Sequence, residues 1–168
     1  DQIGGVNAAT QEDGSPGYGG VFVESFFVFS GHPPTGNAKD TAVETFDQTF
    51  DPFRPDRGEP VRATDLANGV ATLTSGQGCP TAGGDRSLQL SCAIWAFGSM
   101  VGSTLSHEIG HSLGLAPPGD TMVFHNGGNS PRRLMNSGSN RPFEERAELL
   151  GTQPGAFCQA NYDYLRFI

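Results

Sequence analysis

A long, mostly apolar segment from Ser91 to Leu115 constrains the fold of this chain more than any other sequence feature. Its length and its content of Ala, Leu and Met favour a helix buried in the core. Gly98 and Gly102 would allow a neighbouring element to approach this helix closely, and Gly114 is expected to end it. Because the sequence HEIGH stands at positions 107–111, we expect the functional site near the end of the same helix.

Shorter elements are expected on both sides of this segment. Residues 20–30 are dense in Val and Phe and predict a buried strand. Apolar residues at three- and four-residue spacings predict an amphipathic helix from Ala38 to Phe50, which Pro52 would end. Weaker signals mark strands around Val61 and at residues 70–73, and short helices at residues 142–150 and 161–168.

The composition fits one loop-rich globular domain. The chain has 168 residues, of which 24 are Gly and 12 are Pro, and only 17% are charged. A net charge of −8 provides neither the basic surface of a nucleic-acid-binding protein nor a polybasic membrane patch, so neither partner is expected. The apolar run at residues 21–29 is too short to span a bilayer. We expect a monomer.

The three cysteines bear on localisation. None forms a CxxC pair, so a structural zinc site built from cysteines is not expected. A disulfide between Cys79 and Cys92 is preferred because these residues bracket a Gly-rich turn, although Cys158 can replace either one and free thiols remain an alternative. A start at Asp1 without a signal peptide indicates a mature or truncated form, and together with the acidity and the cysteines it predicts a secreted protein.

The HEIGH sequence predicts a zinc site. On a helix, His107 and His111 lie one turn apart on the same face, so both imidazoles can reach one ion. Zinc accepts neutral imidazole nitrogens and keeps an open position for water in catalytic sites. Glu108 would lie beside that water as general base and acid. The pattern therefore predicts a zinc endopeptidase acting on a protein or peptide substrate, whereas the alternative is two exposed polar histidines.

The sequence HEIGHSLG from His107 to Gly114 resembles the zinc-binding consensus HExxHxxG of the metzincin clan of metallopeptidases. The resemblance implies an α+β fold, in which a twisted mixed sheet carries a backing helix and an active-site helix. It implies one catalytic domain over residues 1–168, divided into an upper subdomain at 1–114 and a small irregular lower subdomain at 115–168. It further implies that Gly114 turns the chain beneath the metal and that Met135 forms the Met-turn.

The third zinc ligand departs from the metzincin pattern. Pro117 occupies the position in register and has no donor atom for zinc. His125 is the preferred replacement, since imidazole is a good zinc ligand and the intervening loop is long enough to fold back. Asp120 in the same loop is the alternative. In a gluzincin-type peptidase the ligand would instead be Glu144 or Glu145, for which a role at a helix N-terminus is the simpler interpretation.

Two other functional hypotheses remain open at this point. Pro117 motivates a non-catalytic metal-binding or interaction module that keeps a metzincin frame. An amidase or deacetylase that acts on a non-protein amide would share all of the site chemistry with a peptidase.

Polar residues outside the motif have simpler interpretations. His32 is expected to be a surface residue of a turn. Asp47, Asp51 and Asp56 are expected to form a solvated acidic face, because they lack the spacing of a calcium loop. Calcium is therefore possible as a cofactor but unsupported.

Overall fold

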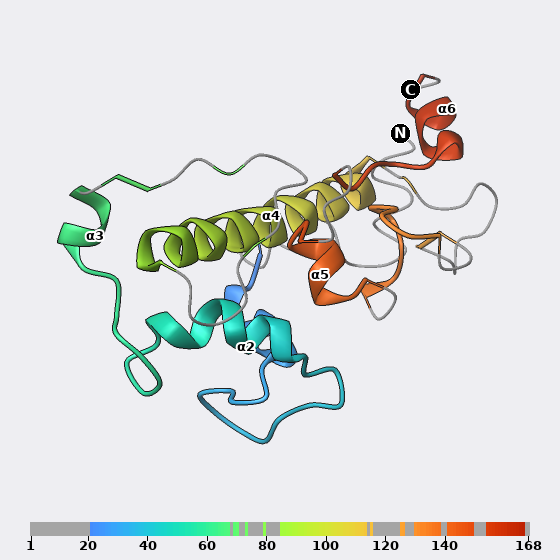
Figure 1. Ribbon diagram of the computed structural model, residues 1–168. Coiled ribbons are helices and arrows are strands. Elements are labelled where there is room, and N and C mark those ends of the chain that lie inside the picture. The colour runs from blue at the N-terminus through green and yellow to red at the C-terminus, as the bar shows by residue number, and fades with distance from the viewer. Residues whose placement is uncertain are drawn as a thin grey trace.

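The computed structural model describes residues 21–67, 69–70, 73, 79, 85–113, 115, 125–126, 130–138, 141–149 and 154–166. Helix α4 runs through the middle of the molecule, α2 and α5 lie alongside it, and α3 and α6 lie near its two ends (Figure 1). The described elements, in chain order, are η1 (Val23–Phe29), α2 (Glu44–Phe50), η2 (Asp51–Phe53), α3 (Ala63–Ala67), α4 (Arg86–Ser112), α5 (Phe143–Arg146) and α6 (Gln159–Leu165).

The predicted α+β fold is wrong, because the described residues contain helices and no β-strand. Their only β-type pairing is an isolated parallel bridge between Arg133 and Ala156. Val61 lies in irregular backbone just before α3, and Val70 and Leu73 belong to no strand, while residues 71–72 lie outside the described part. A metzincin requires a twisted mixed sheet, so this chain is not assigned to that clan despite its HExxHxxG sequence.

The segment predicted to be the first strand forms the 3₁₀ helix η1. Phe26 and Phe29 are both buried, and their spacing of three residues matches the three residues per turn of a 3₁₀ helix. A strand would place Phe26 and Val28 on one face, yet Val28 is 37% exposed. The Phe29 ring packs between two aromatic rings, with centroids 6.4 Å from Phe46 and 5.9 Å from Phe143. Burying both Phe26 and Phe29 favours a 3₁₀ helix, and this effect outweighs the preference of Val and Phe for strands.

The core lies where η1, α2, α4 and α5 meet. Phe46 and Phe143 pack edge to face at its centre, with ring centroids 5.2 Å apart. Burying such side chains contributes about 1.5–3 kcal/mol each. The fully buried core members are Ala96 and Met100 of α4, Phe143 of α5, and Ala147 directly after α5.

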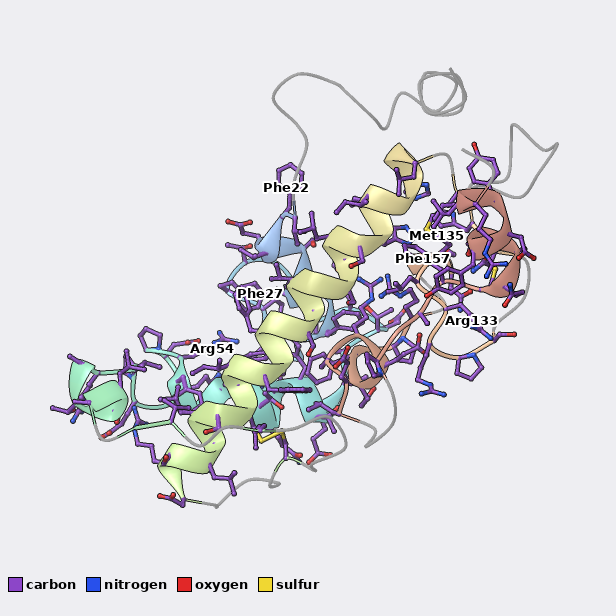
Figure 2. All side chains as sticks on the ribbon, turned by 90° about the horizontal axis from the view of Figure 1, so that it is seen from above. Phe22, Phe27, Arg54, Arg133, Met135 and Phe157 are labelled. Atoms are coloured by element: carbon purple, nitrogen blue, oxygen red, sulfur yellow. A yellow bond between two sulfur atoms is a disulfide. The ribbon has the colours of Figure 1, made fainter. Side chains whose placement is uncertain are left out.

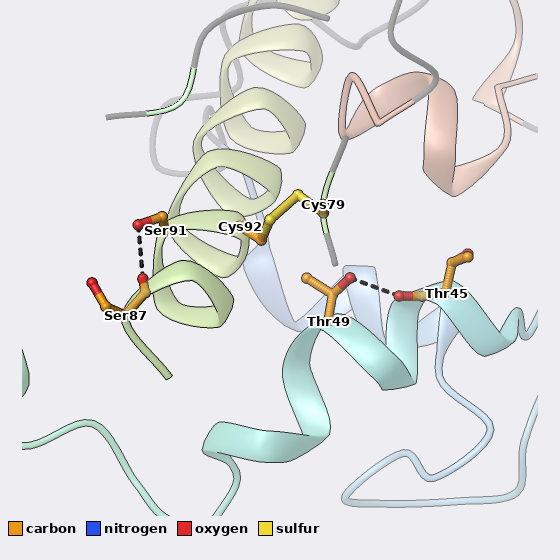
Figure 3. The surroundings of a disulfide bond; sticks show 6 residues. All are labelled: Thr45, Thr49, Cys79, Ser87, Ser91 and Cys92. Carbon is orange, nitrogen blue, oxygen red and sulfur yellow. Dashed lines mark hydrogen bonds between the residues drawn. A yellow bond between two sulfur atoms is a disulfide. The ribbon is translucent and has the colours of Figure 1, made fainter. Parts of the chain in front are cut away.

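Two contacts fix the N-terminal half of α4. The Cys79–Cys92 disulfide confirms the preferred pairing and lies on the side of α4 that faces α2 (Figure 3). The Arg86 guanidinium donates to both carboxylate oxygens of Asp65 at 2.9 Å, which ties α3 to the first turn of α4. The ion pair at Arg86 and the disulfide at Cys92, six residues later, therefore hold the N-terminal half of α4 in place.

Helix α4 is also long and apolar enough, by length and composition, to cross a membrane. One such helix is weak support for a membrane span, because core helices of soluble proteins have the same length and composition. A third of its most apolar window is buried inside the protein. The expected absence of a membrane partner is still a prediction.

Candidate metal centre

Three histidines converge at the C-terminal end of α4. His107 and His111 are 7% and 6% exposed, and His125 joins them from a segment beyond the helix. One ring nitrogen from each residue lies within 4.8 Å of the other two. The His125 ring stacks on His107, with centroids 5.2 Å apart, and meets His111 edge to face at the same distance. The group can hold a metal ion.

A backbone carbonyl sets the orientation of His107. Nδ1 of His107 is hydrogen-bonded to the carbonyl oxygen of Leu134, which can only accept, so Nδ1 carries the proton. In the neutral ring, Nε2 is then the nitrogen with the free lone pair, as metal-binding histidines require. This Nε2 lies 3.1 Å from Nε2 of His111. Two nitrogens bound to a tetrahedral zinc ion at about 2.0–2.1 Å would stand about 3.3 Å apart, so the spacing fits one shared ion.

The environment of His107 keeps its imidazole neutral. Burial is the main cause that lowers the pKa of His107, from 6.5 to about 4, and nearby His111, Arg141 and His125 act in the same direction. The hydrogen bond to Leu134 opposes this shift of the pKa without reversing it. A neutral imidazole is the form that binds a metal ion, so at neutral pH this ring needs no proton release before binding.

Backbone contacts bring His125 to the helix. The next residue, Asn126, donates its N–H to the carbonyl oxygen of Met135 at 2.7 Å. Met135 follows Leu134, the partner of His107, so one short segment positions both histidines. Asn136 is 1% exposed and strengthens the turn by donating to the Ser130 carbonyl oxygen at 2.8 Å. These contacts place His125 beside the C-terminal end of α4, next to His107 and His111.

Gly110 allows the segment around Met135 to approach α4. A Cβ atom at Gly110 would stand 2.3 Å from the sulfur of Met135 and 3.2 Å from the Phe157 ring. Met135 is fully buried, and its side chain lies beside Phe157 (Figure 2). The close approach predicted at Gly98 and Gly102 is wrong, because a Cβ atom at either position would meet no described atom within 4 Å, and Gly110 was not predicted in their place.

The helix ends directly after the histidines. The N–H of Leu115 donates to the carbonyl oxygen of Gly110, which is the hydrogen bond of a Schellman ending. Gly114, predicted to end the helix, lies outside the described residues, as do Pro117 and Asp120. The alternative ligand Asp120 therefore stays a prediction.

The glutamates proposed for a gluzincin-type site lie on α5 and are not members of the histidine group. The Glu144 carboxylate accepts a hydrogen bond from the Thr45 hydroxyl of α2. Oε1 of Glu145 is buried and has no hydrogen-bond partner among the described atoms. Among the described residues, His125 is thus the third donor that accompanies His107 and His111.

Glu108 lies on the solvent side of the same helical turn, where it is exposed. With 3.6 residues per turn, it stands about 60° around the helix axis from His111. Burial lowers the pKa of both Arg141 and Arg146, and the carboxylates of Glu145 and, to a smaller extent, Glu108 oppose this shift. Neither arginine was singled out by sequence reasoning, since no motif contains them.

A second group of possible donors, His32, Asp47 and Asp51, is explained by internal bonds. Asp47 accepts hydrogen bonds from the Ser30 hydroxyl at 2.8 Å and the Gly31 N–H at 2.9 Å. Asp51 pairs with Nδ1 of His32 at 2.9 Å. The third predicted acidic residue, Asp56, is absent from this group and pairs with Arg54 at 2.7 Å. These contacts join η1 to α2 and need no ion.

No protein-family model, curated protein or solved structure matches this chain. The functional argument therefore rests on the geometry of the metal centre and on the chemistry of its side chains.

Proposed function

We propose that this chain is a zinc-dependent hydrolase that cleaves peptide bonds, with His107, His111 and His125 as the zinc ligands and Glu108 as general base and acid. The convergence of three imidazoles from two distant segments carries this proposal. Three neutral nitrogen donors suit zinc and leave one position of a tetrahedral ion for water or substrate. The Leu134 carbonyl supplies the outer hydrogen bond that such ligands have.

Zinc bound at this centre would lower the pKa of water and polarise a substrate carbonyl group. The Glu108 carboxylate accepts a proton from the attacking water and delivers it to the nitrogen of the leaving amine. Its exposed position on α4 leaves room for a substrate on that side. The buried rings of His107 and His111 face the protein interior.

We also propose that the protein acts outside the cytosol. The Cys79–Cys92 disulfide supports this, because such bonds persist in oxidising compartments and are rare in the cytosol. Its closed loop spans the start of the helix that carries the metal centre.

Chelator-reversible cleavage of an unfolded protein substrate tests the proposed activity. We expect o-phenanthroline to stop cleavage and added zinc to restore it. Glu108→Ala should bind zinc as the parent does and lose hydrolysis by about 10²-fold or more, since it removes the proton carrier. Glu59→Ala is the matched control, because Glu59 is exposed near the opposite end of α4.

Two results would contradict the proposal. Hydrolysis that survives in Glu108→Ala would remove Glu108 from the mechanism. A folded, zinc-loaded parent that cleaves neither peptides nor simple amides would instead support the non-catalytic metal-binding module.

A further inference from the structure

A cavity of about 700 Å³ opens between η1, Thr41 and Val43, and the residues at 138 and 141–146. This volume lies in the range of small-molecule and side-chain binding sites. Arg141 and Arg146 are the charged residues of its lining, and none of the lining residues that the structure describes carries a carboxylate. The apolar part of the lining consists of Phe26, Val28, Phe29, Val43, Pro142 and Phe143.

Arg141 lines this cavity and has a buried donor atom without a partner. The residue is only 4% exposed, and its Nε finds no hydrogen-bond partner in the described part of the chain. Burial lowers the pKa of Arg141 from 12.5 to about 10, so the guanidinium is still charged at neutral pH. The Glu145 and Glu108 carboxylates stabilise this charge, but neither residue is in the cavity lining, so the described lining presents only cations to a ligand.

Arg146 is held in place by contacts that leave its charge in the cavity wall. Its guanidinium donates to the carbonyl oxygens of Arg141 and Gly138, both at 3.0 Å. It also lies over the Phe29 ring, 5.6 Å from the centroid. Two fixed guanidinium groups on an apolar wall are notable in a chain with a net charge of −8. Two positive charges beside apolar side chains suit an anionic group on an apolar body, and a carboxylate is the anion that guanidinium groups commonly pair with in proteins.

The cavity lies within electrostatic reach of the metal centre. Arg141 lowers the pKa of His107, and both arginines interact with the Glu108 carboxylate. A direct contact also links the two places, because the Ser103 hydroxyl of α4 donates to the Arg146 carbonyl oxygen at 3.5 Å and Ser103 stands about one helical turn before His107. A ligand anchored at these arginines can therefore extend towards Glu108.

We propose that this cavity binds a carboxylate carried on an apolar body and selects substrates that contain one. The role in substrate selection rests on the proposed hydrolase function, whereas binding of the carboxylate does not. The carboxylate has two possible sources, an acidic side chain of a peptide or its free C-terminus. Both present the same anionic, bidentate acceptor.

Calorimetric titration with 4-phenylbutyrate and its uncharged analogue 4-phenylbutyramide tests the binding. The zinc-loaded parent should bind the carboxylate at least about tenfold more tightly, because charge-assisted hydrogen bonds are the stronger ones. Arg146→Gln should abolish this preference. Arg57→Gln is the matched control, since Arg57 is a half-exposed arginine that is absent from the cavity lining, and it should keep the preference. Equal affinities in the parent, or a preference that survives in Arg146→Gln, would overturn the proposal.

If Arg146→Gln lowers the folded fraction, Arg141→Lys replaces it, because lysine keeps the charge and loses the planar fork. That variant should reduce the preference several-fold, and an unchanged preference would contradict the proposal.

Cleavage of matched peptides identifies the source of the carboxylate. A lower KM for Glu than for Gln peptides indicates a side chain, and a lower KM for free than for amidated C-termini indicates the terminus. Equal KM values in both pairs would refute substrate selection. If no peptide is cleaved, the proposed function fails, and the titration still decides whether the cavity binds carboxylates.

Discussion

Replacing Gly110 with Ala tests how closely the metal centre packs against α4. The added Cβ would stand 2.3 Å from the Met135 sulfur, far inside van der Waals contact, and the buried Met135 must move. Overpacking of this kind costs about 1–3 kcal/mol. Ala is favoured over Gly in a helix interior by about 0.5–1 kcal/mol, which offsets part of the cost. We expect a net loss of roughly 1–2 kcal/mol in the free energy of unfolding.

Gly102→Ala is the matched control on the same helix. Gly102 is exposed, and a Cβ there would meet nothing within 4 Å. This variant should gain about 0.5–1 kcal/mol, because only the helix propensity changes. The two substitutions are chemically identical and should therefore shift stability in opposite directions.

Urea denaturation of the parent and both variants measures the difference. Gly110→Ala should also bind zinc more weakly, because Met135 is covalently joined to Leu134, whose carbonyl orients His107. If Gly110→Ala is as stable as Gly102→Ala and binds zinc like the parent, the close packing described for Met135 is wrong.

Two further predictions concern the start of α4. Reduction of the disulfide, or Cys79→Ser, should lower the free energy of unfolding by about 3 kcal/mol, which is the loop-closure value for a separation of 13 residues. Identical urea midpoints with and without reductant would contradict this prediction. The hydrogen bond from Arg86 is the main cause that lowers the pKa of Asp65 from 3.8 to about 2 in the folded chain. The stabilisation by Asp65 is therefore complete above about pH 4 and is lost as the pH falls towards about 2. The melting temperature of Asp65→Asn should fall less over that range than that of the parent, and equal slopes would contradict the pairing.

Much of the helical framework could be predicted from the sequence. The apolar segment from Ser91 predicted α4, which the structure extends back to Arg86. The three- and four-residue spacings predicted α2, although its first turn begins at Glu44 rather than at Ala38. The Cys79–Cys92 pairing was also predictable, because both residues flank a turn-forming sequence.

The sheet could not be excluded from the sequence, because Val and Phe at residues 20–30 have high β propensity. The three-residue burial period of Phe26 and Phe29 was the signal that distinguishes η1 from a strand. The HExxHxxG resemblance then reinforced the wrong fold, since a short ligand motif requires only one helical turn. A motif of this kind specifies site chemistry and does not specify the surrounding architecture.

The candidate site was predictable only where its residues carry the chemistry themselves. His107, Glu108 and His111 stand in a recognisable pattern, and His125 was chosen for its imidazole. The Leu134 carbonyl has no sequence signature, because any residue supplies a backbone acceptor. Arg141 could not be found either, since its significance depends on burial that only the fold creates.

The most direct test of the metal centre is a competitive zinc titration of the parent, His125→Ala and His32→Ala. His32 is the control, because it lies in the separate group with Asp47 and Asp51. We expect His125→Ala to lower zinc affinity at least about 10²-fold through loss of a ligand, more than Asp120→Ala does, whereas His32→Ala binds zinc like the parent. Parental affinity in His125→Ala, or a larger loss in Asp120→Ala, would contradict the assignment of the third ligand.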